Sequence, residues 1–168
     1  MPDYGLLNPT GTGKVFLNDG DDVFFTGGAK DTVLGGTGGD QIAGGSENDL
    51  QYGGSGDVAL NCGSEDDRLE GGNGRDVLSG GDGADTLTGG RWDDRSAGGT
   101  GADILVFADL SGRDVITDYM QGVDHLQITA SNEVAVLDLG VDCMLQIGLN
   151  KVLFLGVTAA QLADSDFL

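Results

Sequence analysis

The sequence has few basic residues and few aromatic ones. Lysine and arginine together number 8 against 28 aspartate and glutamate residues, which gives a formal net charge of −20. Nucleic acid is therefore excluded as a partner, because binding phosphates requires clustered positive charge. Phe, Trp and Tyr make up 6% of the chain, which is too little large apolar surface for an ordinary globular core of this length. Because so many carboxylates repel one another in a compact state, a cationic partner is expected.

Residues that usually carry catalysis or transition-metal binding are also scarce. His125 is the only histidine, and the motifs HExxH and GxSxG are absent, so the sequence predicts no enzyme. Cys62 and Cys143 lie too far apart in sequence for a paired-cysteine zinc site. A disulfide between them is one alternative, but two free thiols are favoured, because Cys62 stands where most repeats have a loop glycine.

No apolar run is long enough to span a membrane. The first residues, MPDYGLLNPTGTGK, lack a basic segment followed by an apolar core, so no cleavable secretory signal is expected.

Glycine, by contrast, is abundant and periodic. Eleven consecutive rows of nine residues run from Asn8 to Val106 without an insertion. The second position is glycine in nine rows, and the eighth is apolar in nine. The sixth position is aspartate in nine rows, namely Asp22, Asp31, Asp40, Asp49, Asp67, Asp76, Asp85, Asp94 and Asp103. Such a fixed period predicts a repeat architecture and argues against simple disorder.

Each row divides into a glycine-rich turn and a short strand. In the row that begins at Gly71, the turn runs to Asp76, and Val77, Leu78 and Ser79 form a strand with Leu78 pointing inward. A chain that alternates short turns and short strands, without a helix, must coil as a solenoid. Two rows make one circuit, so each row stacks on the row after next at about 4.8 Å.

Stacking brings aspartates of alternate rows together. Asp67 then lies over Asp85, and Asp76 over Asp94, with bent glycine backbone between them. Carboxylates this close are costly unless a hard cation lies between them. Calcium fits, because it accepts six to eight oxygens from carboxylates and backbone carbonyls in flexible geometry, whereas magnesium requires a strict octahedron.

The rows GGTGGDQIA, GGNGRDVLS, GGDGADTLT and GGTGADILV follow the pattern GGxGxDxUx. Over residues 17–106 the sequence resembles the RTX (repeats-in-toxin) family of calcium-binding nonapeptide repeats. The resemblance implies an all-β, right-handed parallel β-roll over residues 8–106, with calcium ions along both edges and a small β-rich cap over residues 107–168. It also implies that the sixth-position aspartate bridges two ions, helped by carbonyls of loop positions one to four.

Carried over to this sequence, the resemblance and the stacking give six to eight calcium ions and the following ligands. The carboxylates are Asp22, Asp31, Asp40, Asp49, Asp67, Asp76, Asp85, Asp94 and Asp103, with Asp114 and Asp124 added in the cap. The backbone donors are Gly36, Gly38, Gly45, Gly54, Gly72, Gly74, Gly81, Gly83, Gly90, Gly99 and Gly101.

Some rows depart from the pattern. Val58 occupies a metal position, so that edge of the roll is expected to bind weakly or to lose an ion. Gln51 and Ser96 replace inward aliphatic residues, which predicts a thin core around them. Basic residues and the only tryptophan are expected on one edge of the roll, where they are suited to sugars or carboxylated polysaccharide; these are Arg75, Arg91, Trp92 and Arg113. The favoured alternative is drift in a degenerate row, without a function for these side chains.

After Val106 the nine-residue frame slips by two residues and the sequence pattern changes. VAVLDL, CMLQI and VLFLGV read as hairpin strands, and Thr158 with Gln161 forms a capping-box pattern that predicts a short helix. The ending, DSDFL, resembles the uncleaved C-terminal signal of RTX proteins exported by type I secretion. We therefore expect a bacterial, extracellular module, with the type I secretion machinery and a fused enzyme domain as partners. The alternative is a carbohydrate-binding or surface-attachment module.

Overall fold

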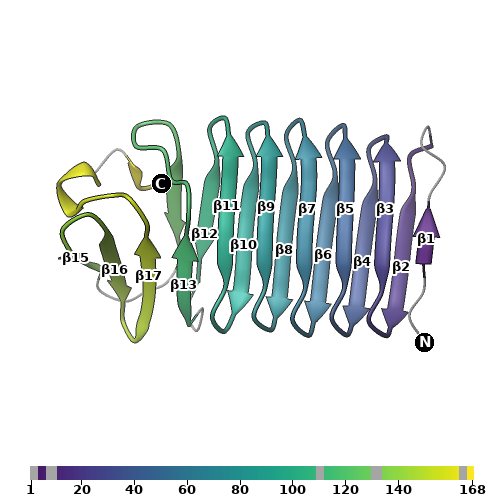
Figure 1. The fold of residues 1–168 in the computed structure, drawn as a ribbon, viewed down its shortest axis with the longest axis horizontal. Coiled ribbons are helices and arrows are strands. Elements are labelled where there is room, and N and C mark those ends of the chain that lie inside the picture. Colours follow the sequence, from purple (N-terminus) through teal and green to yellow (C-terminus); the bar gives the residue numbers. More distant parts are fainter. Residues whose placement is uncertain (1–3, 7–10, 109–111, 130–133, 163–165) are drawn as a thin grey trace.

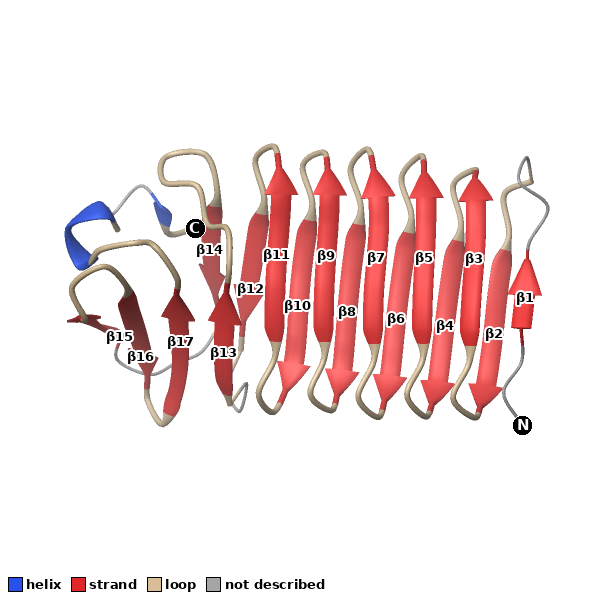
Figure 2. Ribbon diagram, in the orientation of Figure 1, coloured by secondary structure: helices blue, strands red, loops and turns tan. Residues whose placement is uncertain are grey.

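The protein is an all-β parallel solenoid with a small β-rich end (Figures 1 and 2). The structure is a computed structural model that describes residues 4–6, 11–108, 112–129, 134–162 and 166–168. The solenoid strands are β1 (Tyr4–Leu6), β2 (Lys14–Asp19), β3 (Val23–Gly28), β4 (Thr32–Thr37), β5 (Gln41–Ser46), β6 (Leu50–Ser55), β7 (Ala59–Ser64), β8 (Arg68–Asn73), β9 (Val77–Asp82), β10 (Thr86–Arg91), β11 (Arg95–Thr100), β12 (Ile104–Phe107), β13 (Arg113–Ile116) and β14 (His125–Ile128).

Alternate strands belong to opposite sheets. One sheet contains β1, β3, β5, β7, β9, β11 and β13, and continues into the C-terminal hairpins. The other runs from β2 through the even strands to β14. The pairing is parallel with a shift of 18 residues through the repeats, as between Leu69 and Leu87. The predicted stacking of each row on the row after next is therefore confirmed.

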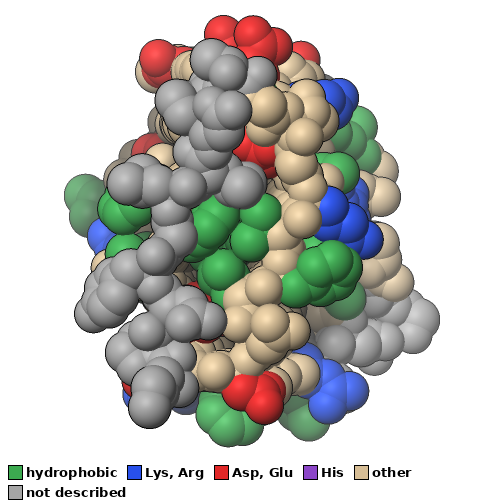
Figure 3. Space-filling model, turned by 90° about the vertical axis from the view of Figure 1, so that its right-hand side faces the viewer, with side chains coloured by type: hydrophobic (Ala, Val, Ile, Leu, Met, Phe, Trp, Pro, Cys, Tyr) green, Lys and Arg blue, Asp and Glu red, His purple; other side chains and the backbone are tan. Residues whose placement is uncertain are grey.

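The core is a narrow file of side chains between the two sheets. The eighth residue of each row points inward, and Val33, Ile42, Leu60 and Leu78 are almost completely buried. Figure 3 looks at the N-terminal end and shows hydrophobic side chains between the sheets, with acidic side chains at the top and bottom edges. Little apolar volume is needed, since each coil stacks on another coil.

Two polar residues interrupt that file, as the sequence predicts. Gln51 is 1% exposed and Ser96 is 6% exposed, and both lie between aliphatic neighbours in the stack. The Gln51 amide nitrogen donates to the carbonyl of Asn61 at 3.1 Å, which satisfies part of its buried polar group. The core is therefore weakest at these two coils, because the methyl groups of an aliphatic side chain are missing there.

Glycine at the second position allows neighbouring coils to approach closely. Gly36 has φ = 110°, and any Cβ at this residue would collide with the carbonyl of Asn18 in the preceding coil. The same stacking recurs between Gly54 and Gly36 and between Gly72 and Gly54. A side chain at this position would both strain the backbone and push two coils apart.

Parallel stacking continues beyond the nonapeptide rows with a longer step. Arg95 pairs with Val115, a separation of 20 residues, and Ile104 pairs with His125, a separation of 21. The step of 20 equals the predicted slip of two residues in the repeat frame, whereas the step of 21 contains one residue more than that slip. Since both sheets extend past Val106 without a break, the domain boundary proposed there stays a prediction.

The C-terminal end consists of antiparallel hairpins. β15 (Val134–Asp138), β16 (Cys143–Ile147) and β17 (Asn150–Phe154) follow one another, and β17 joins the solenoid by parallel pairing with β13. The predicted hairpin strands are thus confirmed. The predicted helix is one 3₁₀ turn, η1 (Ala159–Gln161), in which the backbone N–H of Thr158 donates to Gln161 Oε1 at 2.8 Å.

Both cysteines are free and fully buried, which agrees with the favoured prediction of two free thiols.

Within the described ranges, no helix has the length and apolar character needed to cross a membrane.

Candidate metal centre

The sixth-position aspartates form two columns, one along each edge of the solenoid. The upper column follows the top edge in Figure 1 and contains Asp31, Asp49, Asp67, Asp85 and Asp103. The lower column follows the bottom edge and contains Asp22, Asp40, Asp76 and Asp94, with Val58 between the pairs. These aspartates are at most 4% exposed, although they lie in loops.

Backbone hydrogen bonds link the members of the upper column. The N–H of Asp49 donates to Oδ1 of Asp67 at 2.6 Å, and the N–H of Asp67 donates to Oδ1 of Asp85 at 2.8 Å. The N–H of Asp85 donates in turn to Oδ1 of Asp103 at 2.9 Å. Each carboxylate is therefore oriented by the coil before it, and Oδ1 is used for this purpose.

The second carboxylate oxygen has no such partner. Among the described residues, Oδ2 is buried and accepts no hydrogen bond in Asp31, Asp40, Asp49, Asp67, Asp76, Asp85, Asp94 and Asp103. A buried ionised oxygen without a partner is costly, so a row of them indicates a site suited to a cation. The pattern is the same on both edges, which indicates a repeated site.

Burial raises the pKa of these carboxyls. It raises the pKa of Asp67 to about 7, with the neighbouring carboxylates of Asp85 and Asp49 adding to the shift. The pKa of Asp94 is raised to about 8, again mainly by burial and then by Asp114. The metal-free site thus disfavours the negative charge that the sequence places there, and a bound cation would reverse this effect.

Backbone carbonyls converge with these Oδ2 atoms at the first loop position. A Cβ placed on Gly35 would lie 2.5 Å from Oδ2 of Asp40 and would also collide with the carbonyl oxygen of Gly53 in the next coil. A Cβ on Gly80 would collide with Oδ2 of Asp85 and lie 2.6 Å from the carbonyl oxygen of Gly98. Glycine leaves the space between a carboxylate and a carbonyl open.

The donor set is suited to calcium. Within the described part of the chain, no three side chains of Asp, Glu, His or Cys converge on one point. A metal ion held here must therefore take one or two carboxylates together with backbone carbonyls. Calcium accepts that mixture in flexible geometry, whereas zinc requires nitrogen or sulfur ligands. The residues present fit the ion that the sequence predicts.

Residues 25–57 and 63–91 match the family model of the RTX calcium-binding nonapeptide repeat, which is built of four copies. RTX repeats therefore cover these two stretches of the chain. No curated protein matches the chain. Three solved structures are similar to the RTX solenoid.

The AlgE6R3 subunit of the mannuronan C5-epimerase from Azotobacter vinelandii is 26% identical with a TM-score of 0.55, over 67% of this chain and 78% of that one. The AlgE6R2 subunit of the same enzyme is 25% identical with a TM-score of 0.52, over 79% of this chain and 90% of that one. The extracellular lipase LipA from Serratia marcescens is 16% identical with a TM-score of 0.51. It shares the fold over 98% of this chain, which spans 38% of the lipase.

The lower RTX column is interrupted where the sequence departs from the repeat. The N–H of Asp22 donates to Oδ1 of Asp40 at 3.0 Å, and the series resumes with the N–H of Val58 and Oδ1 of Asp76 at 3.0 Å. A Cβ placed on Gly53 would lie 2.5 Å from Cγ2 of Val58. At Val58, therefore, a methyl group stands where other RTX rows have a carboxylate oxygen.

Beyond the nonapeptide rows, aspartates of the cap extend both RTX columns. Oδ1 of Asp114 accepts from the N–H of Asp94 at 3.1 Å, and Oδ1 of Asp124 accepts from the N–H of Asp103 at 3.1 Å. Asp118 accepts from the N–H groups of Gly98 and Gly99 at 3.1 and 2.9 Å. Asp114 and Asp124 therefore occupy the positions that their spacing predicts.

The predicted glycine donors and the carbonyls found beside Oδ2 occupy different loop positions. The predicted donors stand at positions two and four of each RTX row, and their role stays a prediction. The carbonyls that converge with Oδ2 belong to position-one residues, including Gly53, Cys62, Gly89 and Gly98. Since glycine there leaves the space open, the first glycine of GGxGxD, which recurs from row to row, is the signal that locates them.

A second set of carboxylates was missed by the sequence reasoning. Asp21, Asp57, Asp66 and Asp93 stand at the fifth position, on the exposed side of the loops. Each accepts the backbone N–H of the equivalent residue one coil later, at 2.7 to 3.0 Å. The doublets at residues 21–22, 66–67 and 93–94 are the signal that could have found three of them.

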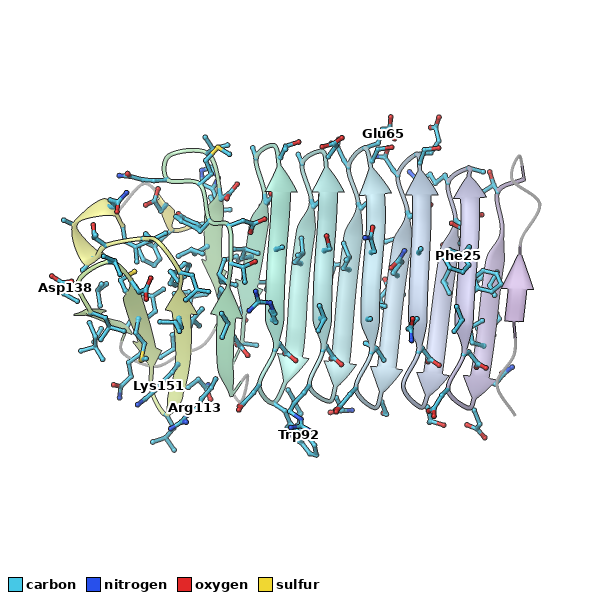
Figure 4. All side chains as sticks on the ribbon, in the orientation of Figure 1. Phe25, Glu65, Trp92, Arg113, Asp138 and Lys151 are labelled. Atoms are coloured by element: carbon cyan, nitrogen blue, oxygen red, sulfur yellow. The ribbon has the colours of Figure 1, made fainter. Side chains whose placement is uncertain are left out.

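Three of the four residues predicted to form a basic edge of the RTX roll lie together. Arg75, Arg91 and Trp92 line one hollow at the lower edge. Arg113 instead lines a neighbouring hollow with Lys151. Figure 4 shows Trp92, Arg113 and Lys151 along this edge.

Proposed function

We propose that this chain is a calcium-binding RTX β-roll module of a secreted bacterial protein, and that it folds when calcium binds outside the cell. The observation that carries the proposal is the double column of buried aspartates, eight of which, from Asp31 to Asp103, hold one carboxylate oxygen without a hydrogen-bond donor among the described residues. A chain with a net charge of −20 cannot bring these groups together without cations. Folding and calcium binding are therefore one process.

The proposal assigns six to eight ions. The five aspartates of the upper column leave four spaces between successive coils, and the lower column adds one space between Asp22 and Asp40 and one between Asp76 and Asp94. Asp114 and Asp124 extend the columns and would complete one or two further sites. In each site the carboxylates would supply negative charge, and the carbonyls of position one and of the predicted glycine donors would complete the oxygen shell.

Secretion is part of the proposal. A chain that stays unfolded in calcium-poor cytosol can pass through a narrow export channel and fold on the far side, which suits type I secretion. Two of the similar structures are subunits of an epimerase and the third is an extracellular lipase, which supports a catalytic domain as the fused partner. The module itself is proposed to be non-catalytic.

Circular dichroism tests the calcium proposal directly. In chelator the chain should give the spectrum of a coil, and calcium should restore the β signal in one cooperative transition. Magnesium at the same concentration should not substitute, since it requires an octahedral shell. An unchanged β spectrum in chelator would contradict calcium-dependent folding.

A reporter assay tests the secretion proposal separately. The chain is placed behind a small reporter and expressed in bacteria with and without a type I transporter. The reporter should reach the medium only when the transporter is present. A control lacking residues 107–168 should remain in the cell, and export of that control would contradict the assignment of the signal to the C-terminal segment.

A further inference from the structure

The lower edge has a hollow whose chemistry differs from the rest of this acidic chain. Its volume is about 580 Å³, within the range of small-ligand sites. The lining residues are Arg75, Arg91, Trp92, Asp93, Gly112 and Asn150. They come from three places: the loop after β8, the end of β10 with the loop that follows it, and the paired starts of β13 and β17. The hollow therefore exists only in the stacked solenoid.

Trp92 occupies a backbone position that disfavours large side chains. It stands at the fourth position of its row with φ = 87°, where Gly38, Gly74 and Gly83 stand in other rows. Glu47 and Glu65 take the same left-handed backbone at this loop position, so the turn tolerates a side chain there, and its geometry requires no indole. The indole is 63% exposed and projects from the lower edge (Figure 4). It contributes little to the core from there.

Positive charge gathers around this indole. Arg75 pairs with Asp57 at 3.3 Å, while Arg91 forms no ion pair with any described residue. Arg113 and Lys151 pair across β13 and β17 and line the next hollow. Four of the 8 basic residues of the chain thus lie along this one stretch. An edge with this composition is suited to an anion.

We propose that this hollow binds a carboxylated saccharide, as a site distinct from the calcium columns. The exposed indole would stack on the apolar face of a pyranose ring, and the guanidinium groups of Arg75 and Arg91 would pair with its carboxylate. The strip of Arg113 and Lys151 continues from the hollow and would take the next acidic unit of a chain. A saccharide satisfies both the aromatic and the cationic side of the site.

The calcium column and this hollow share a loop. Residues 91–93 line the hollow, and Asp94 follows directly in the lower column. Asp93 is itself held in place, because its Oδ1 accepts the N–H of Arg113 at 3.0 Å. Binding is therefore tested in saturating calcium, after the β spectrum has been recorded. A loss of saccharide binding can then be distinguished from a failure of the chain to fold with calcium.

Tryptophan fluorescence gives a direct assay, because Trp92 is the only tryptophan in the chain. The calcium-loaded protein is titrated with trigalacturonate, and in parallel with maltotriose as an uncharged trisaccharide. Trigalacturonate should produce a saturable change that weakens as salt is added. Maltotriose should produce none. An equal response to inorganic phosphate would reveal a general anion site and would overturn the saccharide assignment.

Matched variants separate binding from structure. Arg91→Gln and Arg75→Gln should each weaken trigalacturonate binding about tenfold, as expected for a lost charge-assisted hydrogen bond. Arg68→Gln removes the same charge from the start of β8, beside the upper column and away from the hollow, and should leave binding unchanged. Equal affinity in Arg91→Gln and Arg68→Gln would overturn the proposal.

Trp92→Gly distinguishes a ligand-binding role from a structural one. Glycine relieves the left-handed backbone, so the calcium-loaded protein should unfold at an equal or higher temperature. Trigalacturonate binding, measured by calorimetry, should be lost at the same time. A variant that loses stability and keeps its affinity would assign Trp92 to the fold and refute its role in binding.

Discussion

Replacing Asp67 with alanine removes a carboxylate from the middle of the unbroken upper column. The side chain of Asp67 is oriented by its Oδ1, which accepts the N–H of Asp49 at 2.6 Å. The backbone N–H of Asp67 donates in turn to Oδ1 of Asp85 at 2.8 Å. Oδ2 is buried without a donor, on the side where the metal is proposed. If the ions lie between successive coils, this one carboxylate serves two of them, and both sites lose a ligand.

The size of the effect follows from the number of ions taken up together. One charge-assisted contact contributes about 1.5 to 3 kcal/mol, so two contribute about 3 to 6 kcal/mol. In a cooperative transition that binds about six ions, the midpoint concentration changes by the exponential of this energy divided by about 6RT. The calcium midpoint of Asp67→Ala should therefore rise about two- to fivefold.

Two other variants make the test specific. Asp66→Ala removes the same charge one residue earlier, from an exposed side chain, and should leave the midpoint nearly unchanged. Val58→Asp places a carboxylate where Cγ2 of Val58 now approaches Gly53, and should leave the midpoint equal or lower by completing a site. Calcium titrations followed by circular dichroism give all three midpoints. If Asp67→Ala behaves like Asp66→Ala or like Val58→Asp, the assignment of the columns is wrong.

Three further predictions concern protons, thiols and one glycine. Burial raises the pKa of Asp94 from 3.8 to about 8 in the folded, metal-free state, whereas the coil in chelator keeps ordinary carboxyl pKa values. The calcium midpoint should therefore stay nearly constant from about pH 8 to about pH 5 and rise below about pH 5, where protons compete for the carboxylates; a midpoint that already rises between about pH 8 and about pH 6 would show a folded metal-free state that takes up protons and would contradict coupled folding. Cys62 and Cys143 are fully buried, so both thiols should resist iodoacetamide in calcium and react with it in chelator. Mass spectrometry measures the labelling, and equal labelling in both conditions would count against coupled folding. Gly71→Ala places a methyl group between Oδ2 of Asp76 and a carbonyl of the next coil, and should raise the calcium midpoint several-fold. The control Gly39→Ala, whose added Cβ would lie 3.2 Å from its nearest neighbour, should leave the midpoint unchanged. Equal midpoints for the two variants would show that the space beside Gly71 is not part of a calcium site.

The two columns of aspartates could be predicted from the sequence because the nine-residue period determines them. A period of nine with two rows per coil places every second aspartate on the same edge, and Val58 is visible as the interruption without any coordinates. The slip of two residues after Val106 likewise appears as the 20-residue step between Arg95 and Val115. In each case a local pattern repeats, so local reasoning is sufficient.

Features that depend on contacts outside the repeat could not be predicted. Asn150 reaches the basic hollow because β17 pairs with β13, and no spacing in the sequence encodes that pairing. The inward direction of the first loop position, where Cys62 is fully buried, depends on how tightly two coils stack. The fifth-position carboxylates were missed because their partners are backbone N–H groups, which every sequence has.

The 18-residue step of the sheets sets the unit in which such a chain can change length. Gaining or losing 18 residues within the repeats would add or remove a whole coil, and β17 would still meet β13 on the same sheet. Gaining or losing nine would move every later strand to the opposite sheet, although the core would still receive one inward aliphatic residue per row. β13 and β17 would move together and still pair, so the C-terminal hairpins would be carried to the opposite face of the solenoid. A change of two nonapeptides therefore keeps these hairpins on the same face as before, whereas a change of one nonapeptide turns them by half a coil relative to the first strands.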